Sequence, residues 1–368
     1  MLILAVFIGL RYKVGADWLQ YYTYYNNVED LSTIIFDSKN ATYFYEHNWE
    51  PAFKFLCAMA KSSGISFEVL LLLITLFNLY SLDKFLRRYL SNDACIFLVL
   101  LLALNMLREF DVLRQSLAFY IMLFAYKYIN KSFPKYLAIC LLAATFHMSA
   151  LIFLPIYPFF KLKVTRTLLV SVLVFFLLNL ILKLKFLTMI ITLIEKVIPS
   201  GITGVVLHQV RLYLVELPVY SNINLVTILY LLLLITLIVY FEKAKKMDSK
   251  FISVFVICIV VNVLFSEIGE IQSRFAYFFS IGPVYCLTRS IGFFGSYKRM
   301  LYVCTIIIYS NIKIVLPMRV EATKLTYTPY RNYLFYFTKD PAVEQEIMER
   351  HSKAAQLNSD FFNDNIKN

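Results

Sequence analysis

Long runs of apolar residues, interrupted only by an occasional Thr or Asn, constrain this chain more than any other feature. Examples are residues 70–79 and 228–240. Such runs lack the alternating polarity that the strands of a transmembrane barrel require. Inside a bilayer, a continuous apolar segment satisfies its own backbone hydrogen bonds only as a helix. The sequence therefore predicts an all-α fold, a polytopic transmembrane helical bundle.

The composition excludes most other classes of protein. Hydrophobic residues make up 60% of the 368 residues and charged residues only 16%, whereas a soluble domain has about 45–50% and about 25%. One water-soluble core cannot bury so much apolar surface, which excludes a soluble enzyme, a disordered chain and a fibrous repeat. The net charge of +12 is typical of cytoplasmic Lys and Arg that fix membrane topology, so nucleic acid is not an expected partner.

Metal, nucleotide and disulfide chemistry find no support in the motifs. The six cysteines lie in apolar stretches without a CxxC pair, and the four histidines are scattered. The sequence contains no GxxxxGK[ST], HExxH or GxSxG motif, which argues against ATP-driven transport, zinc proteolysis and lipase-type hydrolysis. We therefore expect no metal site, no disulfide framework and no cofactor.

About ten membrane spans are predicted, within one integral membrane domain of residues 1–335. The hydrophobic segments are 66–86, 94–107, 111–129, 134–158, 166–182, 222–241, 251–266, 274–292 and 299–316. Residues 1–10 are too few to cross a hydrocarbon core of about 30 Å, and form half a helix or the remnant of a longer one. Residues 336–368 are predicted to be a polar, partly disordered C-terminal tail.

Clusters of Lys and Arg set the expected topology, because such residues favour the cytoplasmic side. The four clusters are Lys84/Arg87/Arg88, Lys127/Lys131/Lys135, Lys243/Lys245/Lys246/Lys250 and Arg289/Lys298/Arg299. Residues 11–65 and residues 200–221, which belong to a second long insertion at 183–221, then form two long outward-facing segments. Only three obvious spans separate the second cluster from the third, although parity requires an even number. Either 134–158 is a re-entrant hairpin broken near His147, or 186–198 adds a short pass. The second solution is favoured, because about 25 residues make one ordinary tilted span.

Two arginines at the predicted outer rim are candidates for binding an anion. Arg108 and Arg114 flank the short connection between two spans, on the side that positive charge normally avoids. A guanidinium group binds phosphate through two parallel hydrogen bonds and stays charged at physiological pH. The alternative is that both arginines pair with Glu109 and Asp111.

Three further positions carry groups suited to chemistry. Arg11 and Asp17 begin the first outer segment, where they form a loop ion pair or take part in a site. Glu50 precedes Pro51 at an expected helix start. His147 lies in an apolar run, either as a hydrogen-bonded structural residue or, with an unperturbed pKa near 6.5, as a proton acceptor.

The last candidates lie toward the C-terminus. Arg274 is close in sequence to Glu267 and Glu270, at the predicted outer end of a span. Tyr327, Pro329 and Tyr330 suit either carbohydrate stacking or packing at the membrane surface, and packing is favoured.

Taken together, these motifs resemble those of the EpsG group of Wzy-type polysaccharide polymerases. The matching motifs are Arg11-x3-Gly15-x-Asp17-x3-Tyr21, Glu50-Pro51, Arg114-Gln115-Ser116-Leu117-Ala118, Phe146-His147-Met148-Ser149-Ala150 and Arg274. Each motif is weak alone, but their order and wide spacing match over about residues 5–335. One departure is the N-terminus, since such proteins usually have a full helix before the first motif.

The resemblance implies a metal-independent glycosyltransferase in the bacterial inner membrane. Such polymerases join oligosaccharide repeat units carried on undecaprenyl diphosphate into O-antigen or a related surface polysaccharide, at the outer face of the membrane. The implied partners are these lipid-linked oligosaccharides, the lipid bilayer and a chain-length regulator protein. The alternatives are a lipid-linked oligosaccharide flippase or other transporter, and an O-antigen ligase.

In such a reaction the residues above would take two kinds of role. Arg108 and Arg114 would bind the diphosphate, with Arg11 or Arg274 assisting, because clustered cations stabilise the charge of the leaving group. His147 or Asp17 would accept the proton of the attacking hydroxyl, with Glu50 as a third candidate for this base.

Overall fold

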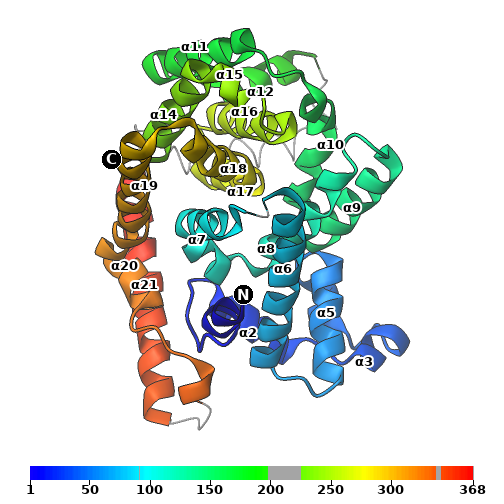
Figure 1. Ribbon diagram of the computed structural model, residues 1–368. Coiled ribbons are helices and arrows are strands. Elements are labelled where there is room, and N and C mark those ends of the chain that lie inside the picture. Colours follow the sequence, from blue (N-terminus) through cyan, green and yellow to red (C-terminus); the bar gives the residue numbers. More distant parts are fainter. Residues whose placement is uncertain (91, 198–224, 337–340, 368) are drawn as a thin grey trace. The chain divides into compact units, whose positions relative to one another are not determined.

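The fold is all-α, as predicted. The computed structural model describes residues 1–90, 92–197, 225–336 and 341–367, and every regular element within these ranges is helical (Figure 1). The chain divides into two compact units, which are taken separately below. The first comprises Met1–Ala94, Leu102–Leu154 and Asn311–Asn368, and the second Cys95–Leu101 and Pro155–Ser310.

Helix α6 (Phe67–Tyr89) is the longest apolar helix at the centre of the first unit. It begins at Ser66, whose hydroxyl accepts the Val69 N–H, and it ends with two arginines that complement the helix dipole. On one side α6 packs against the π-helical turn η1 (Ala5–Gly9), and on another against α8 (Leu113–Leu123), which in turn contacts α9 (Phe133–Phe146). The Arg114–Ala118 motif on α8 therefore lies beside the helix at whose end the Phe146–Ala150 motif begins.

The first outer segment folds into short helices around an aromatic core. These are α2 (Trp18–Asn27), α3 (Leu31–Phe36), α4 (Thr42–Glu46) and α5 (Pro51–Ser62). Pro51 occupies the first turn of α5, where its missing N–H costs nothing, as the Glu50-Pro51 motif predicts. The buried core includes Trp18, Tyr21, Tyr24, Phe53 and Phe67. Aromatic burial gives this polar-rich segment a fixed shape.

Residues 134–158 do not form one continuous span. Helix α9 ends at Phe146, and the 3-10 helix η3 (Met148–Ile152) begins after His147, whose backbone is extended (φ −157°, ψ 115°). The chain then doubles back, since the Tyr136 hydroxyl donates to the Phe153 carbonyl at 2.8 Å. The preference for a single tilted helix was wrong, because the local hydrogen bonding of His147 competes with continuation of the helix.

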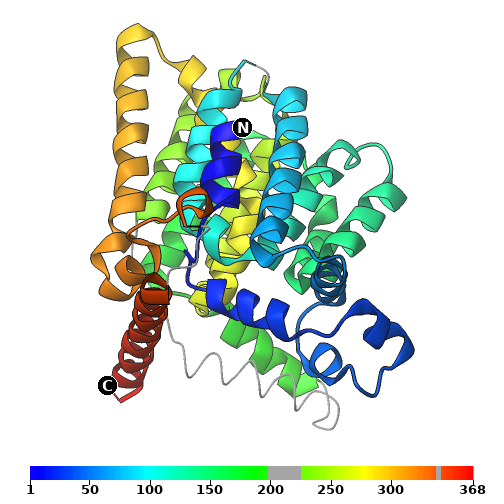
Figure 2. The ribbon, with the colours of Figure 1, turned by 90° about the horizontal axis from the view of Figure 1, so that it is seen from below.

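The C-terminal part of the first unit returns to the N-terminus (Figure 2). Asn332 forms an isolated antiparallel bridge with Arg11, and the Tyr12 N–H donates to the Arg331 carbonyl at 2.9 Å. Helix α20 (Glu321–Tyr327) packs against α21 (Pro341–Lys367). Helix α21 covers most of the tail for which the sequence predicts partial disorder.

In the second unit, α16 (Ser249–Leu264) and α18 (Ile281–Ser290) make the closest helix pair. A Cβ atom on Gly282 would lie 2.4 Å from the Phe255 backbone nitrogen, so only glycine permits this approach. The remaining long elements are α11 (Arg166–Leu182), α12 (Phe186–Val197), α14 (Leu225–Val239), α17 (Gly269–Phe279) and most of α19 (Ser296–Val315). Most of the predicted second outer segment lies outside the described residues, as does the last residue of the proposed short pass.

Within the part of the chain that the structure describes, two helical stretches are long and apolar enough to cross a membrane, namely Phe67–Tyr89 and Ser296–Arg319. Five shorter apolar helices accompany them: Phe133–Phe146, Met148–Lys161, Arg166–Leu182, Leu225–Val239 and Ser249–Leu264. A helix of about 20 residues is needed to cross the hydrocarbon core without other adjustment. The total of ten spans therefore remains a prediction.

Candidate functional site

Arg114 and Glu50 form an ion pair in the first unit. Arg114 lies in the first turn of α8 and Glu50 immediately precedes α5. Their side chains are 18% and 11% exposed, so the pair is largely removed from water. The Arg114 guanidinium also lies over the Trp49 ring, 4.6 Å from its centroid. Trp49 thus stacks on the planar cation in a way that an ammonium group cannot reproduce.

Glu50 also holds the turn of the α9–η3 hairpin. Its second carboxylate oxygen accepts the Met148 N–H at 3.0 Å. Met148 directly follows His147, at the point where the chain reverses. One carboxylate therefore joins the start of α5, the start of α8 and the hairpin turn.

Tyr21, the last residue of the first motif, completes this group. It lies on α2 beside Arg114, and burial raises the pKa of its phenol while the Arg114 charge opposes that shift. Its ring packs against Trp49, with centroids 5.1 Å apart. We refer to Tyr21, Trp49, Glu50, Arg114 and the Met148 N–H as the Arg114 cluster.

His147 lies next to the cluster and caps a helix. Its side chain is 8% exposed. Its Nδ1 atom accepts the Ser149 N–H at 3.4 Å and lies 2.5 Å from the Ser149 hydroxyl oxygen. These contacts match the hydrogen-bonded structural alternative for this residue.

Arg11, which belongs to the same motif as Tyr21, is buried. Its guanidinium donates to the Ile8 carbonyl at 2.7 Å and to the Phe110 carbonyl at 3.2 Å, and it lies over the Phe110 ring. The carboxylates whose charge acts on it are Asp111 and Glu109. The described contacts of Arg11 are thus with its own preceding turn and with the end of α7 (Ala94–Asp111).

Asp111 fastens the Gly15 turn to the end of α7. Its carboxylate accepts the Ala16 N–H at 2.7 Å and the hydroxyl of Tyr327. Burial and the Asp111 charge raise the pKa of Tyr327, so the phenol stays protonated and donates. Gly15 has φ +120°, and a Cβ there would lie 2.9 Å from the Phe110 carbonyl oxygen. The turn therefore requires glycine for both its conformation and its space.

Asp17 follows this turn at the start of α2. Its side chain is half-buried. Its charge acts on both Tyr21 and Asp111. Asp17 is thus the acidic residue between the Gly15 turn and the Arg114 cluster.

A family model described as EpsG family matches residues 1–332. The chain belongs to the EpsG family. This membership confirms the resemblance seen in the sequence and indicates a membrane protein of polysaccharide biosynthesis. No curated protein matches the chain, and no solved structure matches it.

Two further arginines predicted to bind the diphosphate, Arg108 and Arg274, lie outside the Arg114 cluster. Arg108 lies on α7, where its charge acts on Lys313, and it is not among the described contacts of Arg114. Arg274 lies on α17 in the second unit, with an exposed side chain. Arg114 itself pairs with Glu50 rather than with Glu109, whose carboxylate accepts the Tyr120 hydroxyl at 3.2 Å.

Tyr330 packs against the N-terminal part of the chain. Its ring stacks on Phe7, with centroids 4.6 Å apart, and its hydroxyl donates to the Phe7 carbonyl at 2.6 Å. This contact fixes the returning C-terminal segment to the short N-terminal helix.

Sequence reasoning missed Trp49 and the Met148 N–H. Trp49 is one of only two tryptophans and directly precedes Glu50, which is a usable signal. The backbone donor has no signal in the residue type, because it depends on the hairpin turn. Among the described residues, no group of three or more His, Cys, Asp or Glu is arranged to hold a metal ion.

Proposed function

We propose that the protein is a polymerase that joins oligosaccharide repeat units carried on a polyprenyl diphosphate, at the outer face of the bacterial inner membrane. The product is an O-antigen or related surface polysaccharide. The observation that carries this proposal is the Arg114 cluster, in which residues from four motifs up to 127 positions apart meet.

The chemistry of the cluster suits a diphosphate leaving group. In the transfer, the bond between the anomeric carbon and the diphosphate oxygen breaks, and a bond to an acceptor hydroxyl forms. Negative charge then develops on the diphosphate, which a cation held in a water-poor site stabilises strongly. Glu50 and Trp49 fix the Arg114 guanidinium, and the Arg114 Nε atom is buried without a hydrogen-bond partner. That N–H remains as a donor for an incoming phosphate oxygen.

The other predicted cations are proposed to support Arg114. Arg108, Arg11 and Arg274 are the candidates for holding the second phosphate or the second lipid-linked substrate. Arg11 already donates to two carbonyl oxygens, which favours a positioning role for it.

The base is proposed from His147, Asp17 and Glu50. Both oxygens of Glu50 are engaged, by Arg114 and by the Met148 N–H, and His147 uses Nδ1 in its cap. A base must have an acceptor atom within reach of the sugar hydroxyl. Glu50 is therefore the least suited of the three, which leaves Asp17, half-buried at the start of α2, and His147.

The hairpin at His147 supports a revised topology. A re-entrant hairpin returns the chain to the side from which it came, so the parity of the Lys and Arg clusters is satisfied without a pass at 186–198. Helix α12 has twelve residues, about 18 Å of helix, which is short for a span. A cysteine placed at Asn92, in a background lacking the native exposed cysteines, is expected to resist an impermeant thiol reagent in intact cells. Labelling there would refute the orientation.

A flippase and a ligase are the alternatives, and one experiment separates the three. Deleting the gene in its source cells should leave single repeat units at the cell surface and no polymer ladder. A flippase deletion would instead remove all repeat units from the surface. A ligase deletion would leave polymer on its lipid carrier without transfer to the final acceptor.

A further inference from the structure

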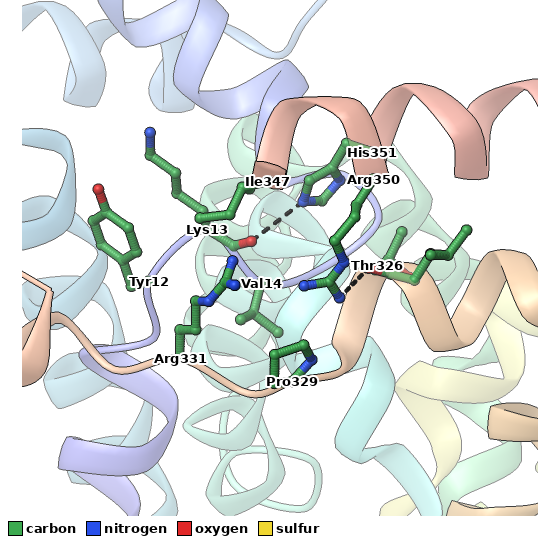
Figure 3. A pocket seen from close by; sticks show the side chains of 10 residues that line it. Tyr12, Lys13, Val14, Thr326, Pro329, Arg331, Ile347, Arg350 and His351 are labelled. Carbon is green, nitrogen blue, oxygen red and sulfur yellow. Dashed lines mark hydrogen bonds between the residues drawn. The ribbon is translucent and has the colours of Figure 1, made fainter. Parts of the chain in front are cut away.

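A basic pocket lies in the first unit, and none of the residues that line it belongs to the Arg114 cluster. It is formed by residues 12–14, the end of α20 with residues 329 and 331, and one face of α21 (Figure 3). Its basic lining residues are Lys13, Arg331, Arg350 and His351. Helix α21 begins beyond residue 332, where the family match ends.

Among the described residues, the carboxylates that pair with the cations of this pocket are fewer than those cations. Glu344 pairs with Lys13 at 2.7 Å. Glu346 serves both arginines, with oxygens 2.8 Å from Arg331 and 3.6 Å from Arg350. Two guanidinium groups thus share one carboxylate, and that carboxylate is half exposed. Such an arrangement favours a further anion.

Arg331 carries a buried donor without a partner, which indicates a ligand independently of the balance of charges. The residue is 8% exposed, and its Nε–H has no hydrogen-bond partner. A buried, charged donor that makes no hydrogen bond destabilises the protein, unless a ligand accepts the bond. Figure 3 shows the Arg331 and Arg350 side chains reaching toward one another from opposite walls, with the Arg350 guanidinium anchored on the Leu325 carbonyl at 2.7 Å.

The pocket residues of α20 follow closely in the sequence on a candidate membrane span. Helix α20 follows within two residues of the apolar stretch Ser296–Arg319. Phe335, four residues after Arg331, is 81% exposed. An exposed aromatic residue just beyond a span is typical of the membrane–water interface.

We propose that this pocket binds a phosphate group, held between Arg331 and Arg350 with Lys13 at its edge. Bound phosphate would tie α21 and α20 to the loop that carries Arg11 and Gly15. The site is separate from the proposed transfer chemistry. Its phosphate comes either from a membrane lipid or from solution, and the chemistry of recognition is the same for both.

The test uses the full-length protein purified in a neutral, phosphate-free detergent. Its unfolding temperature is measured with sodium phosphate or sodium chloride at equal ionic strength. It is measured again in nanodiscs with or without an anionic phospholipid. Phosphate should raise the unfolding temperature in a saturable way. A rise with the phospholipid alone would identify the lipid as the source, and no rise with either would overturn the proposal.

Three variants make the test specific. Arg350→Gln should weaken phosphate binding roughly tenfold or more, as expected for one charge-assisted hydrogen bond. The matched control is Arg319→Gln, an exposed arginine on the neighbouring turn, which should bind as the wild type does. Glu346→Gln removes the competing carboxylate and should tighten phosphate binding. If Glu346→Gln instead weakens or abolishes the phosphate effect in a folded protein, the arginines serve only an internal ion-pair network and the site is refuted.

Discussion

Replacing Arg114 by Lys tests the central claim about the Arg114 cluster. Lysine keeps the charge, so it can still pair with Glu50 and leave the fold intact. It loses the planar stack on Trp49, worth about 0.5–2 kcal/mol. It also loses the Nε–H donor that is buried without a partner, worth about 1.5–3 kcal/mol if a phosphate oxygen accepts it. Because about 1.4 kcal/mol corresponds to a tenfold change in rate, we expect the lost hydrogen bond alone to lower polymerisation roughly tenfold to a hundredfold, and the lost stack to add to that.

The assay is complementation of the deletion strain, with polymer ladders compared at matched amounts of membrane protein. The control is Arg87→Lys, because Arg87 forms an exposed helical ion pair with Asp83. That variant should give a normal ladder. Near-normal ladders from Arg114→Lys would remove Arg114 from the binding of the diphosphate.

A second variant separates catalysis from folding. Arg114→Gln leaves the Glu50 carboxylate largely buried without its cation, which costs about 3–5 kcal/mol, so the protein should accumulate poorly. Combining it with Glu50→Gln removes both charges and should restore the amount of protein but not the ladder. A normal ladder from the double variant would show that the pair is only structural.

Three further predictions follow from the local geometry. Gly15→Ala should lower the free energy of unfolding by about 1–3 kcal/mol, more than Gly64→Ala, because Gly64 also has positive φ but has open space around it; equal losses measured by thermal unfolding would contradict this. In His147→Asn, the amide side chain can still accept the N–H of the residue two positions on, so the variant should retain polymerisation if His147 is only a helix cap. Loss of a general base would instead lower the rate roughly a hundredfold to ten-thousandfold. Loss of the ladder with His147→Asn at a normal protein level would therefore support the catalytic role. Burial lowers the pKa of His351 in the folded protein below 6.5, so as the pH falls the unfolded chain binds a proton before the folded chain does. The stability that is present above pH 6.5 is therefore lost as the pH falls through the lowered folded-state pKa. His351→Gln should show a smaller drop in unfolding temperature between pH 7 and pH 5, and an unchanged drop would refute this contribution.

The sequence predicted those parts of the fold that depend on local pattern. Continuous apolar runs identified helices such as α6, and Pro51 after Glu50 located the start of α5, because both signals act within a few residues. The break at His147 was not resolved, since its flanking residues are as apolar as those of a continuous helix. What decides it is a hydrogen bond from Ser149 within the turn and a distant one from Met148 to Glu50.

The candidate site was predicted by residue type but not by partner. Glu109 and Asp111 are nearest to Arg114 in the sequence, so they were the partners considered in the alternative to anion binding. The structure instead pairs Arg114 with Glu50, 64 positions away. Sequence proximity fails here because Asp111 is already held by the Gly15 turn and Tyr327. Long-range aromatic packing around α2 and α5 then brings Glu50 to α8.

Glu50 is better placed to organise the site than to perform proton transfer. One oxygen accepts from Arg114 and the other from the Met148 N–H, so protonation of either would weaken a contact that positions the phosphate-binding cation or the hairpin. The same carboxylate couples these elements: a movement of the hairpin turn changes the geometry of Arg114 through a single side chain. Arrival of a diphosphate would compete with Glu50 for the guanidinium, and the freed carboxylate would then release Met148 more easily. The cluster is thereby suited to a reaction in which substrate binding and rearrangement of the hairpin occur together.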